Sequence, residues 1–173
     1  MKKTLVIPAL MLLAASAATA QVTNPVSSAL REILPGRQKN TVAAIEAMPA
    51  EKFSFKPTVD QMTFGHLVAH MVEANNVLCS KAAAVAAPKV DEVKDTDSKE
   101  KLVAALKASF NFCSETLAKM DDSKLGETAE IFPGRQASRA WASLVLASSW
   151  ADHYAEGAMY LRLNGVLPPT AKK

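Results

Sequence analysis

The sequence predicts an all-α protein, folded as a four-helix bundle. Two observations support this: apolar residues recur at helical spacing over four long stretches, and no stretch shows the two-residue alternation of a strand. Segments rich in Pro, Gly or charge separate the stretches and are expected to end the helices. About 150 residues follow a leader sequence, enough for one domain with a sizeable core.

The first helix is expected to begin at Asn24, an N-cap residue that is followed by Pro at the first helical position. Pro35-Gly36 is expected to break or kink it, because Pro removes a backbone donor. The helix then resumes from Arg37 to Met48. In the following loop, we expect the rings of Phe53 and Phe55 to plug the end of the bundle.

Two further helices are expected around a charged linker. The second should begin at the N-cap Thr63 and run to about Ala84. The linker AAPKVDEVKDTD has low hydrophobicity and reads as a solvated connection. Asp97, with Glu100 three residues on, resembles a capping box for a third helix from Ser98 to Met120.

The last helix is predicted from about Ala137 to Asn164 and carries an unusual polar face. Ser149, His153, Glu156 and Tyr160 lie at i, i+4, i+7 and i+11, on one side of a helix. Apolar residues surround this polar face: Leu146, Trp150, Leu161 and Leu163. The helix is therefore expected to be buried, where titratable groups are costly unless paired. Such a cost indicates a functional site.

The N-terminus has the three parts of a secretory signal. Lys2-Lys3 precede an apolar run from Thr4 to Leu13, and the small residues Ala18-Thr19-Ala20 follow. We expect cleavage after Ala20, so that residues 1–20 are the signal peptide and 21–173 the domain. The mature protein would be periplasmic or secreted, with no membrane attachment. An uncleaved membrane anchor is the alternative.

Charge argues against a nucleic-acid partner. The formal charge of the whole chain is +3, and loss of Lys2 and Lys3 leaves 18 basic against 17 acidic residues, or +1. Neither a basic excess nor a basic stripe with interleaved aromatic residues is present. A homodimer through the helix faces stays open.

Cys79 and Cys113 are the only cysteines. In an oxidising compartment a disulfide between them is a natural hypothesis, and two buried free thiols are the alternative. Each cysteine lies about fifteen residues into its helix, so a bridge would make the second and third helices parallel. A linker of roughly thirteen residues spans up to about 40 Å, so the required crossover is feasible.

Three stretches resemble one family. HYAE followed by GAMYLRLNGVLPP, together with AMPAEKFSFKPT (47–58) and MTFGHLVAHMVEANNVLCS (62–80), resembles the DinB/YfiT-like superfamily, in particular its exported, periplasmic members. The resemblance implies an up-down-down-up bundle with a divalent-metal site. The family's usual ligands are one His on the second helix and two on the last. His70 and His153 match two of these positions, and Ser149 occupies the third.

The chain has only three His, and all of them fall on these two helices. If His70 and His153 converge, they could share zinc or nickel, because such ions take neutral imidazole nitrogens. The candidates for a third ligand are Ser149, Glu156, Glu73 and His66. The alternative is a hydrogen-bonded pair without an ion.

Two functions follow from the resemblance, and no catalytic residue is assigned in either. Enzymatic members of the superfamily use a divalent metal to transfer a low-molecular-weight thiol to an electrophile, which implies a metal-dependent enzyme acting on a small molecule. The second is a non-catalytic binding or stress-associated bundle that kept the fold and lost the metal chemistry. Ser149 is the residue that separates the two hypotheses.

Overall fold

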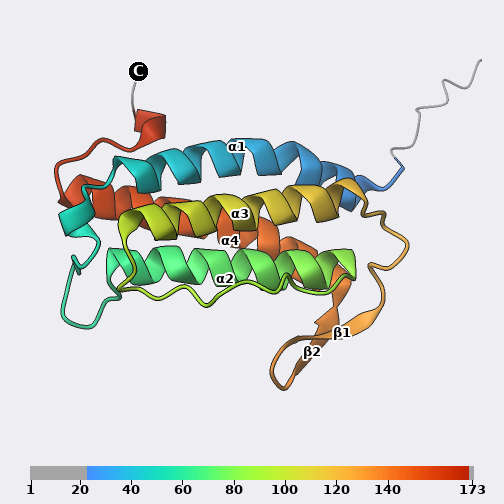
Figure 1. Ribbon diagram of the computed structural model, residues 1–173. Helices are drawn as coiled ribbons and strands as arrows, with labels where there is room; N and C mark the ends of the chain where they lie inside the picture. Colours follow the sequence, from blue (N-terminus) through green and yellow to red (C-terminus); the bar gives the residue numbers. More distant parts are fainter. Residues whose placement is uncertain (1–22, 172–173) are drawn as a thin grey trace, which may run out of the picture.

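A computed structural model describes residues 23–171, so the expected signal peptide lies outside the described residues. The chain forms four long helices and one β-hairpin (Figure 1). The helices are α1 (Pro25–Ala47), α2 (Phe64–Ala83), α3 (Lys99–Ala118) and α4 (Arg139–Leu163). None of the described helices combines the length and the apolar composition that a membrane span needs.

The helices follow the expected up-down-down-up order. Figure 1 shows α2 and α3 running in the same direction, with α1 and α4 opposite to them. The linker between α2 and α3 returns along the outside of α2. Gly65 allows this path, because a Cβ there would collide with the carbonyl oxygen of Asp95 in the linker. The all-α bundle predicted from the sequence is therefore confirmed.

Helix α1 differs from the expected broken helix. It continues through Pro35, which lies inside its range. Pro35 and Gly36 are exposed, so water can replace the hydrogen bond that Pro cannot donate. The buried side chains of Leu34 and Ile45 lie on either side of the proline and keep both halves against the core.

The start of α1 also differs from the sequence prediction. Asn24 precedes the helix, but its side chain makes no capping bond and its φ is 56°. Asp122 caps the helix instead: its carboxylate accepts the backbone N–H groups of Val26 at 2.8 Å and Ser27 at 2.9 Å. Asn24 Oδ1 in turn accepts the backbone N–H of Asp122. Burial favours a higher pKa for Asp122, but the bonds from Ser27 and Val26 outweigh it and lower the pKa.

The expected capping box of α3 is also wrong in detail. Ser98, not Asp97, is the N-cap, and its hydroxyl accepts the backbone N–H of Lys101 at 3.3 Å. Asp97 accepts the backbone N–H of Lys94 and forms an ion pair with Lys101 at 2.8 Å. Its carboxylate therefore closes the end of the linker rather than the helix.

A β-hairpin contradicts the expectation that no strand occurs. Strands β1 (Thr128–Phe132) and β2 (Arg135–Ser138) pair antiparallel around the Pro133-Gly134 turn, with an irregularity between Glu130 and Phe132. Gly134 has a φ of 74°, a conformation that suits glycine. Arg139, directly after β2, donates to the carbonyl oxygen of Lys81 at 2.6 Å and so fixes the hairpin near the end of α2.

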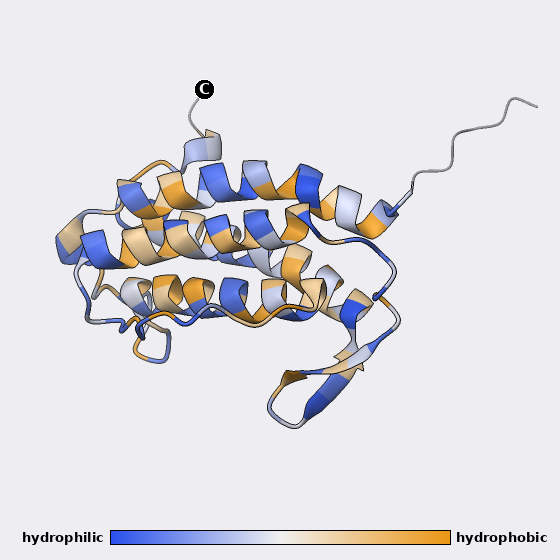
Figure 2. Ribbon diagram, turned by 45° about the vertical axis from the view of Figure 1, so that its right-hand side comes forward, coloured by the Kyte–Doolittle hydropathy of each residue, from blue (hydrophilic) through white to orange (hydrophobic). Residues whose placement is uncertain are grey.

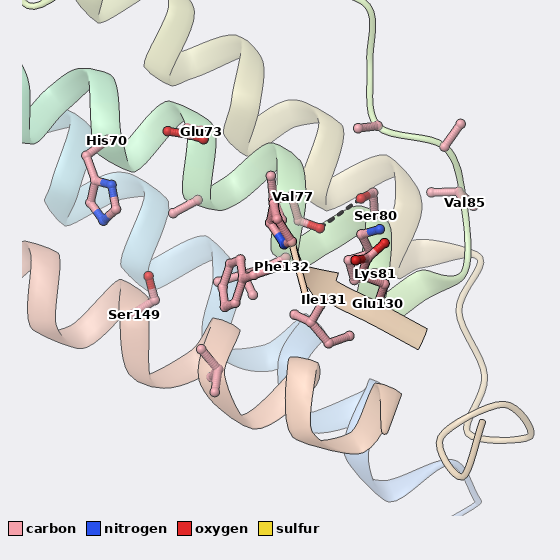
Figure 3. Close-up of a pocket in the computed structure, with 16 residues that line it drawn as sticks. His70, Glu73, Val77, Ser80, Lys81, Val85, Glu130, Ile131, Phe132 and Ser149 are labelled. Atoms are coloured by element: carbon pink, nitrogen blue, oxygen red, sulfur yellow. Dashed lines mark hydrogen bonds between the residues drawn. The ribbon is translucent and has the colours of Figure 1, made fainter. Parts of the chain in front are cut away.

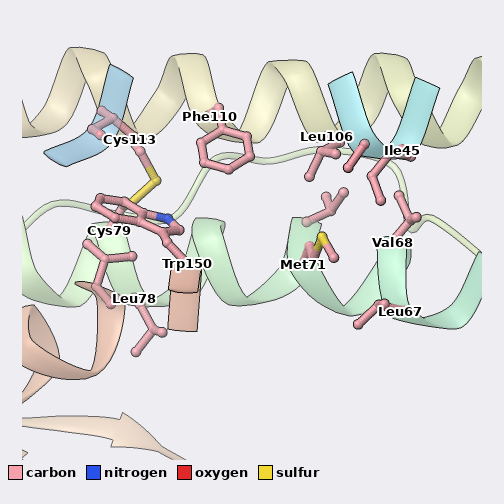
Figure 4. Packing of buried hydrophobic residues seen from close by; sticks show 14 of the residues in the cluster. Ile45, Leu67, Val68, Met71, Leu78, Cys79, Leu106, Phe110, Cys113 and Trp150 are labelled. Atoms are coloured by element: carbon pink, nitrogen blue, oxygen red, sulfur yellow. A yellow bond between two sulfur atoms is a disulfide. The ribbon is translucent and has the colours of Figure 1, made fainter. Parts of the chain in front are cut away.

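The core lies between the four helices, whose hydrophobic residues face inward (Figure 2). A disulfide joins Cys79 of α2 to Cys113 of α3, as expected, and both residues are fully buried (Figure 4). Beside it, Trp150 Nε1 donates to Asn75 Oδ1 at 2.9 Å, and Asn75 Nδ2 donates to Ser109 Oγ at 3.0 Å. These contacts join α2, α3 and α4 through satisfied polar groups.

Aromatic rings close the end of the bundle where α2 begins. Phe53 is buried and meets Phe64 edge to face, with ring centroids 5.1 Å apart. Phe55 meets Tyr160 of α4 in the same way at 6.3 Å. Tyr160 donates its hydroxyl to the carbonyl oxygen of Met62 at 2.7 Å. The loop between α1 and α2 thus plugs the bundle as its sequence indicated.

Candidate functional site

Helices α2 and α4 bring His70 and His153 together. Their ring centroids are 5.0 Å apart, and the ring planes meet at 80°. The two residues are far apart in the sequence, and their proximity follows from the side-by-side packing of α2 and α4. This pair is the centre of the candidate site.

The site lies at the surface rather than in the core. His70 is exposed and His153 is half-buried. The sequence suggested that α4 is buried on most sides. This expectation is wrong, because Leu144 is 68% exposed and Leu163 is 55% exposed. One face of α4 packs into the core. On its polar face, Ser149, His153 and Glu156 are half-buried beside α2, whereas Tyr160 is fully buried. A small molecule can therefore reach the imidazole pair without opening the bundle.

Ser149 orients His153. Its Oγ lies 3.3 Å from His153 Nδ1, one helical turn away. Because Nδ1 is engaged, Nε2 is the nitrogen available to a ligand. The pKa of His153 is lowered to about 4, chiefly by burial and then by the nearby His70, while Asp152 opposes the shift. His153 is therefore a neutral imidazole at pH 7, the form that binds metal ions.

The other candidate ligands are arranged less favourably. His66 is exposed, and its Nδ1 lies 3.9 Å from Asp95 Oδ2, so it faces the linker. Glu156 is half-buried one turn beyond His153; the pKa of Tyr160 is raised by burial and, secondarily, by the charge of Glu156. Glu73 is exposed on α2, one turn beyond His70. The structure joins only Ser149 directly to the imidazole pair.

The centroid separation of the two imidazoles is that of two ligands of one tetrahedral ion and equally that of an edge-to-face ring pair. A ring nitrogen lies about 1.1 Å from its centroid and bonds zinc at about 2.1 Å, so two imidazoles on a tetrahedral ion have centroids about 5 Å apart. The observed separation is 5.0 Å. Within residues 23–171, however, no three His, Cys, Asp or Glu side chains are grouped closely enough to hold a metal ion. Among the described residues, a metal ion at this position would therefore have the two imidazoles of His70 and His153 as its strong protein ligands.

A groove of about 880 Å³ begins at His70 and Ser149 and extends beside α2 toward the hairpin (Figure 3). Phe132 of β1 and Val145 of α4 line it. Its size falls in the range of about 300–1,000 Å³ that is typical of small-molecule sites. Sequence reasoning missed the contribution of Phe132 because it missed the hairpin. The TAEIF-PG-RQAS pattern, two short runs around a Pro-Gly turn, was the available signal.

Comparisons with known proteins agree with this fold. A DinB-like protein of Bacillus cereus has a TM-score of 0.67 and 18% identity, over 82% of this chain and 95% of that one. A DinB-like protein of Bacillus subtilis has a TM-score of 0.63 and 15% identity, over 79% and 92% of the two chains. A search of curated proteins found no match. The family model of the DinB superfamily matches residues 34–156, and the chain therefore belongs to the DinB superfamily.

Proposed function

We propose that this chain binds a divalent ion, zinc or nickel, through His70 and His153 and acts on a small molecule in the adjoining groove. The observation that carries the proposal is the 5.0 Å separation between the ring of His153 and that of His70, which lines the groove. The lowered pKa of His153 supports it, because a neutral imidazole binds a metal without first losing a proton.

The reaction proposed is transfer of a low-molecular-weight thiol to an electrophile, the chemistry that the family resemblance implies. A divalent ion supplies Lewis acidity, which lowers the pKa of a bound water or thiol. In this transfer the S–H bond of the thiol breaks and its proton passes to water. The sulfur forms the new bond to the electrophilic carbon as the bond from that carbon to its leaving group breaks, and the leaving group departs with that electron pair. His153 has a pKa of about 4 and is a weak base at neutral pH, so its part is to hold the ion rather than to take that proton.

A second candidate is a binding protein without catalysis. It is favoured by Ser149, which occupies the third ligand position and already bonds His153. With only two imidazoles, affinity for the ion would be low, and the groove would be the part of the site that functions. The Ser149→His variant distinguishes the two candidates, because a third imidazole would complete the ligand set.

The test is calorimetric titration of the untagged, chelator-treated protein with Zn²⁺ and Ni²⁺. We expect one ion per chain and loss of binding in His70→Ala. His66→Ala is the matched control, since it removes a His one turn away on the same helix, and should bind as the wild type does. Ser149→His should bind at least tenfold more tightly, about 1.4 kcal/mol. Equal losses in His66→Ala and His70→Ala would refute the two-imidazole site.

We also propose that the protein is exported. The signal-like N-terminus and the buried disulfide both support this, because disulfides persist in oxidising compartments. Sequencing the N-terminus of the product from a cell envelope fraction should give a chain that begins at Gln21. A product that retains Met1 would contradict the proposal.

A further inference from the structure

The groove that begins at His70 is lined by apolar side chains, and none of them fills its volume. Phe132, on the hairpin, is 39% exposed, and its ring lies in the middle of the groove (Figure 3). Val77 of α2 and Val145 of α4 line the groove as well. Covering such surface releases about 25 cal/mol for each Å² removed from water, so an apolar group would be stabilised there.

The charges at the two ends of the groove differ. Glu73 lies at the His70 end, whereas Lys81 lies eight residues further along α2, about 12 Å away at 1.5 Å per residue. Glu130 also lines the groove. With Glu73, Glu130 and Lys81, the groove lining has a formal charge of −1. A ligand whose charged group reaches the imidazole end therefore meets Glu73 before any cation of the groove.

Acidic residues on both sides of the groove strengthen this negative potential. On the linker side of α2, a second hollow shares His70 and Glu73 and is lined by Asp91, Glu92, Asp95 and a single Lys94. On α4, Asp152 is exposed next to His153, and its charge acts on that imidazole. The imidazole end of the groove is thus a region that favours cations.

We propose that this groove binds an organic cation, an amine with an aromatic or aliphatic body. The ammonium group would lie at Glu73, and the body would cover Phe132, Val77 and Val145. The ring of Phe132 offers an apolar aromatic face to that body. This binding needs neither imidazole as a metal ligand. A divalent ion held by His70 would repel the ammonium group, so the binding is a property of the metal-free protein.

The test uses three probes with one apolar body and different charge: 3-phenylpropylamine, 3-phenylpropanol and 3-phenylpropanoate. Titration calorimetry at pH 7 with a chelator present excludes any effect of a metal ion. We expect the amine to bind at least threefold more tightly than the alcohol, and the carboxylate to bind most weakly. A carboxylate that binds as tightly as the amine, or an amine that does not bind, would overturn the proposal.

Two kinds of variant locate the ligand. Glu73→Gln should weaken the amine three- to tenfold and leave the alcohol unchanged, because only the charge contact is lost. Val145→Trp should fill the groove and weaken both probes at least tenfold. Leu144→Trp is its matched control, since Leu144 is the adjacent residue and is 68% exposed to solvent.

Circular dichroism establishes that both Trp variants are folded. If Val145→Trp does not fold, Glu73→Gln alone decides, since its side chain is exposed and of the same size. An amine affinity that Glu73→Gln leaves unchanged would show that the cation does not bind at this end. If Leu144→Trp weakens the amine as much as Val145→Trp does, the binding site is not the groove.

Discussion

The two sides of α2 differ in how completely they are closed to water. Toward α3, Asn75 and Cys79 are buried, and their contacts are covalent or fully paired. Toward the groove, His70 and Glu73 are exposed to solvent and line the groove. The same helix thus carries a rigid support on one side and a ligand-accessible surface on the other. Changes on the two sides should affect different properties, stability on the first and binding on the second.

The largest expected effect is loss of the disulfide. Replacing Cys79 and Cys113 by Ala opens a loop of 34 residues, and the chain-entropy estimate for such a loop is about 4 kcal/mol. Denaturant unfolding of the double variant should show a loss of this size. Reduced wild-type protein is the control and should lose a similar amount. A double variant with unchanged stability would mean that the support toward α3 depends on packing alone.

A smaller loss is expected from Trp150→Phe. This change keeps most of the apolar volume but removes the donor to Asn75 Oδ1, which is then buried without that partner. Leaving a buried polar group unpaired costs about 1–3 kcal/mol. Trp141→Phe is the control, because Trp141 is only half-buried and contacts Arg135 and Phe132 on the hairpin. Thermal unfolding of the two variants measures the difference.

The pH dependence of stability tests the groove side. The pKa of His153 falls from 6.5 to about 4 on folding, chiefly because of burial. Between these values the unfolded chain takes up a proton that the native imidazole does not, so stability should decrease as pH falls from about 6.5 toward 4. We expect a loss of about 1–2 kcal/mol after allowance for solvent screening at a partly exposed group. The control is His153→Gln, which should lack this slope.

The smallest effect on stability is expected for His70→Ala. His70 is exposed, and surface substitutions usually change stability by no more than about 0.5 kcal/mol. Denaturant unfolding in the presence of chelator checks this value. A loss above about 2 kcal/mol would contradict the division of roles between the two sides of α2, because the imidazole would then be a structural element.

The helices could be predicted from the sequence, because their apolar residues recur at regular spacing. Apolar spacing placed α2 and α3 within a few residues of their observed bounds. The predicted N-cap Thr63 lies directly before α2, whereas the cap of α3 is Ser98, one residue beyond the predicted Asp97.

Features that depend on very short strands, or on contacts between residues far apart in the sequence, could not be predicted. The hairpin has strands of five and four residues. The side chains of β1 alternate between exposed and more buried positions, but over five residues with Ile131 as the one buried side chain this pattern is a weak signal. The exposure of His70 depends on the path of the linker and hairpin around it, which no periodicity records. The sequence therefore predicted the pair of imidazoles, but not the groove that gives them access to a ligand.

The cap of α1 has a consequence for the order in which the protein can be completed. Asp122 lies 96 residues beyond Val26, whose N–H it accepts. During synthesis, the first helix lacks its cap until 96 residues beyond Val26 have been made. An N-terminal fragment that stops before this residue should hold its first turn only loosely. The first turn of α1 is therefore stabilised only in a chain that has been made at least as far as Asp122.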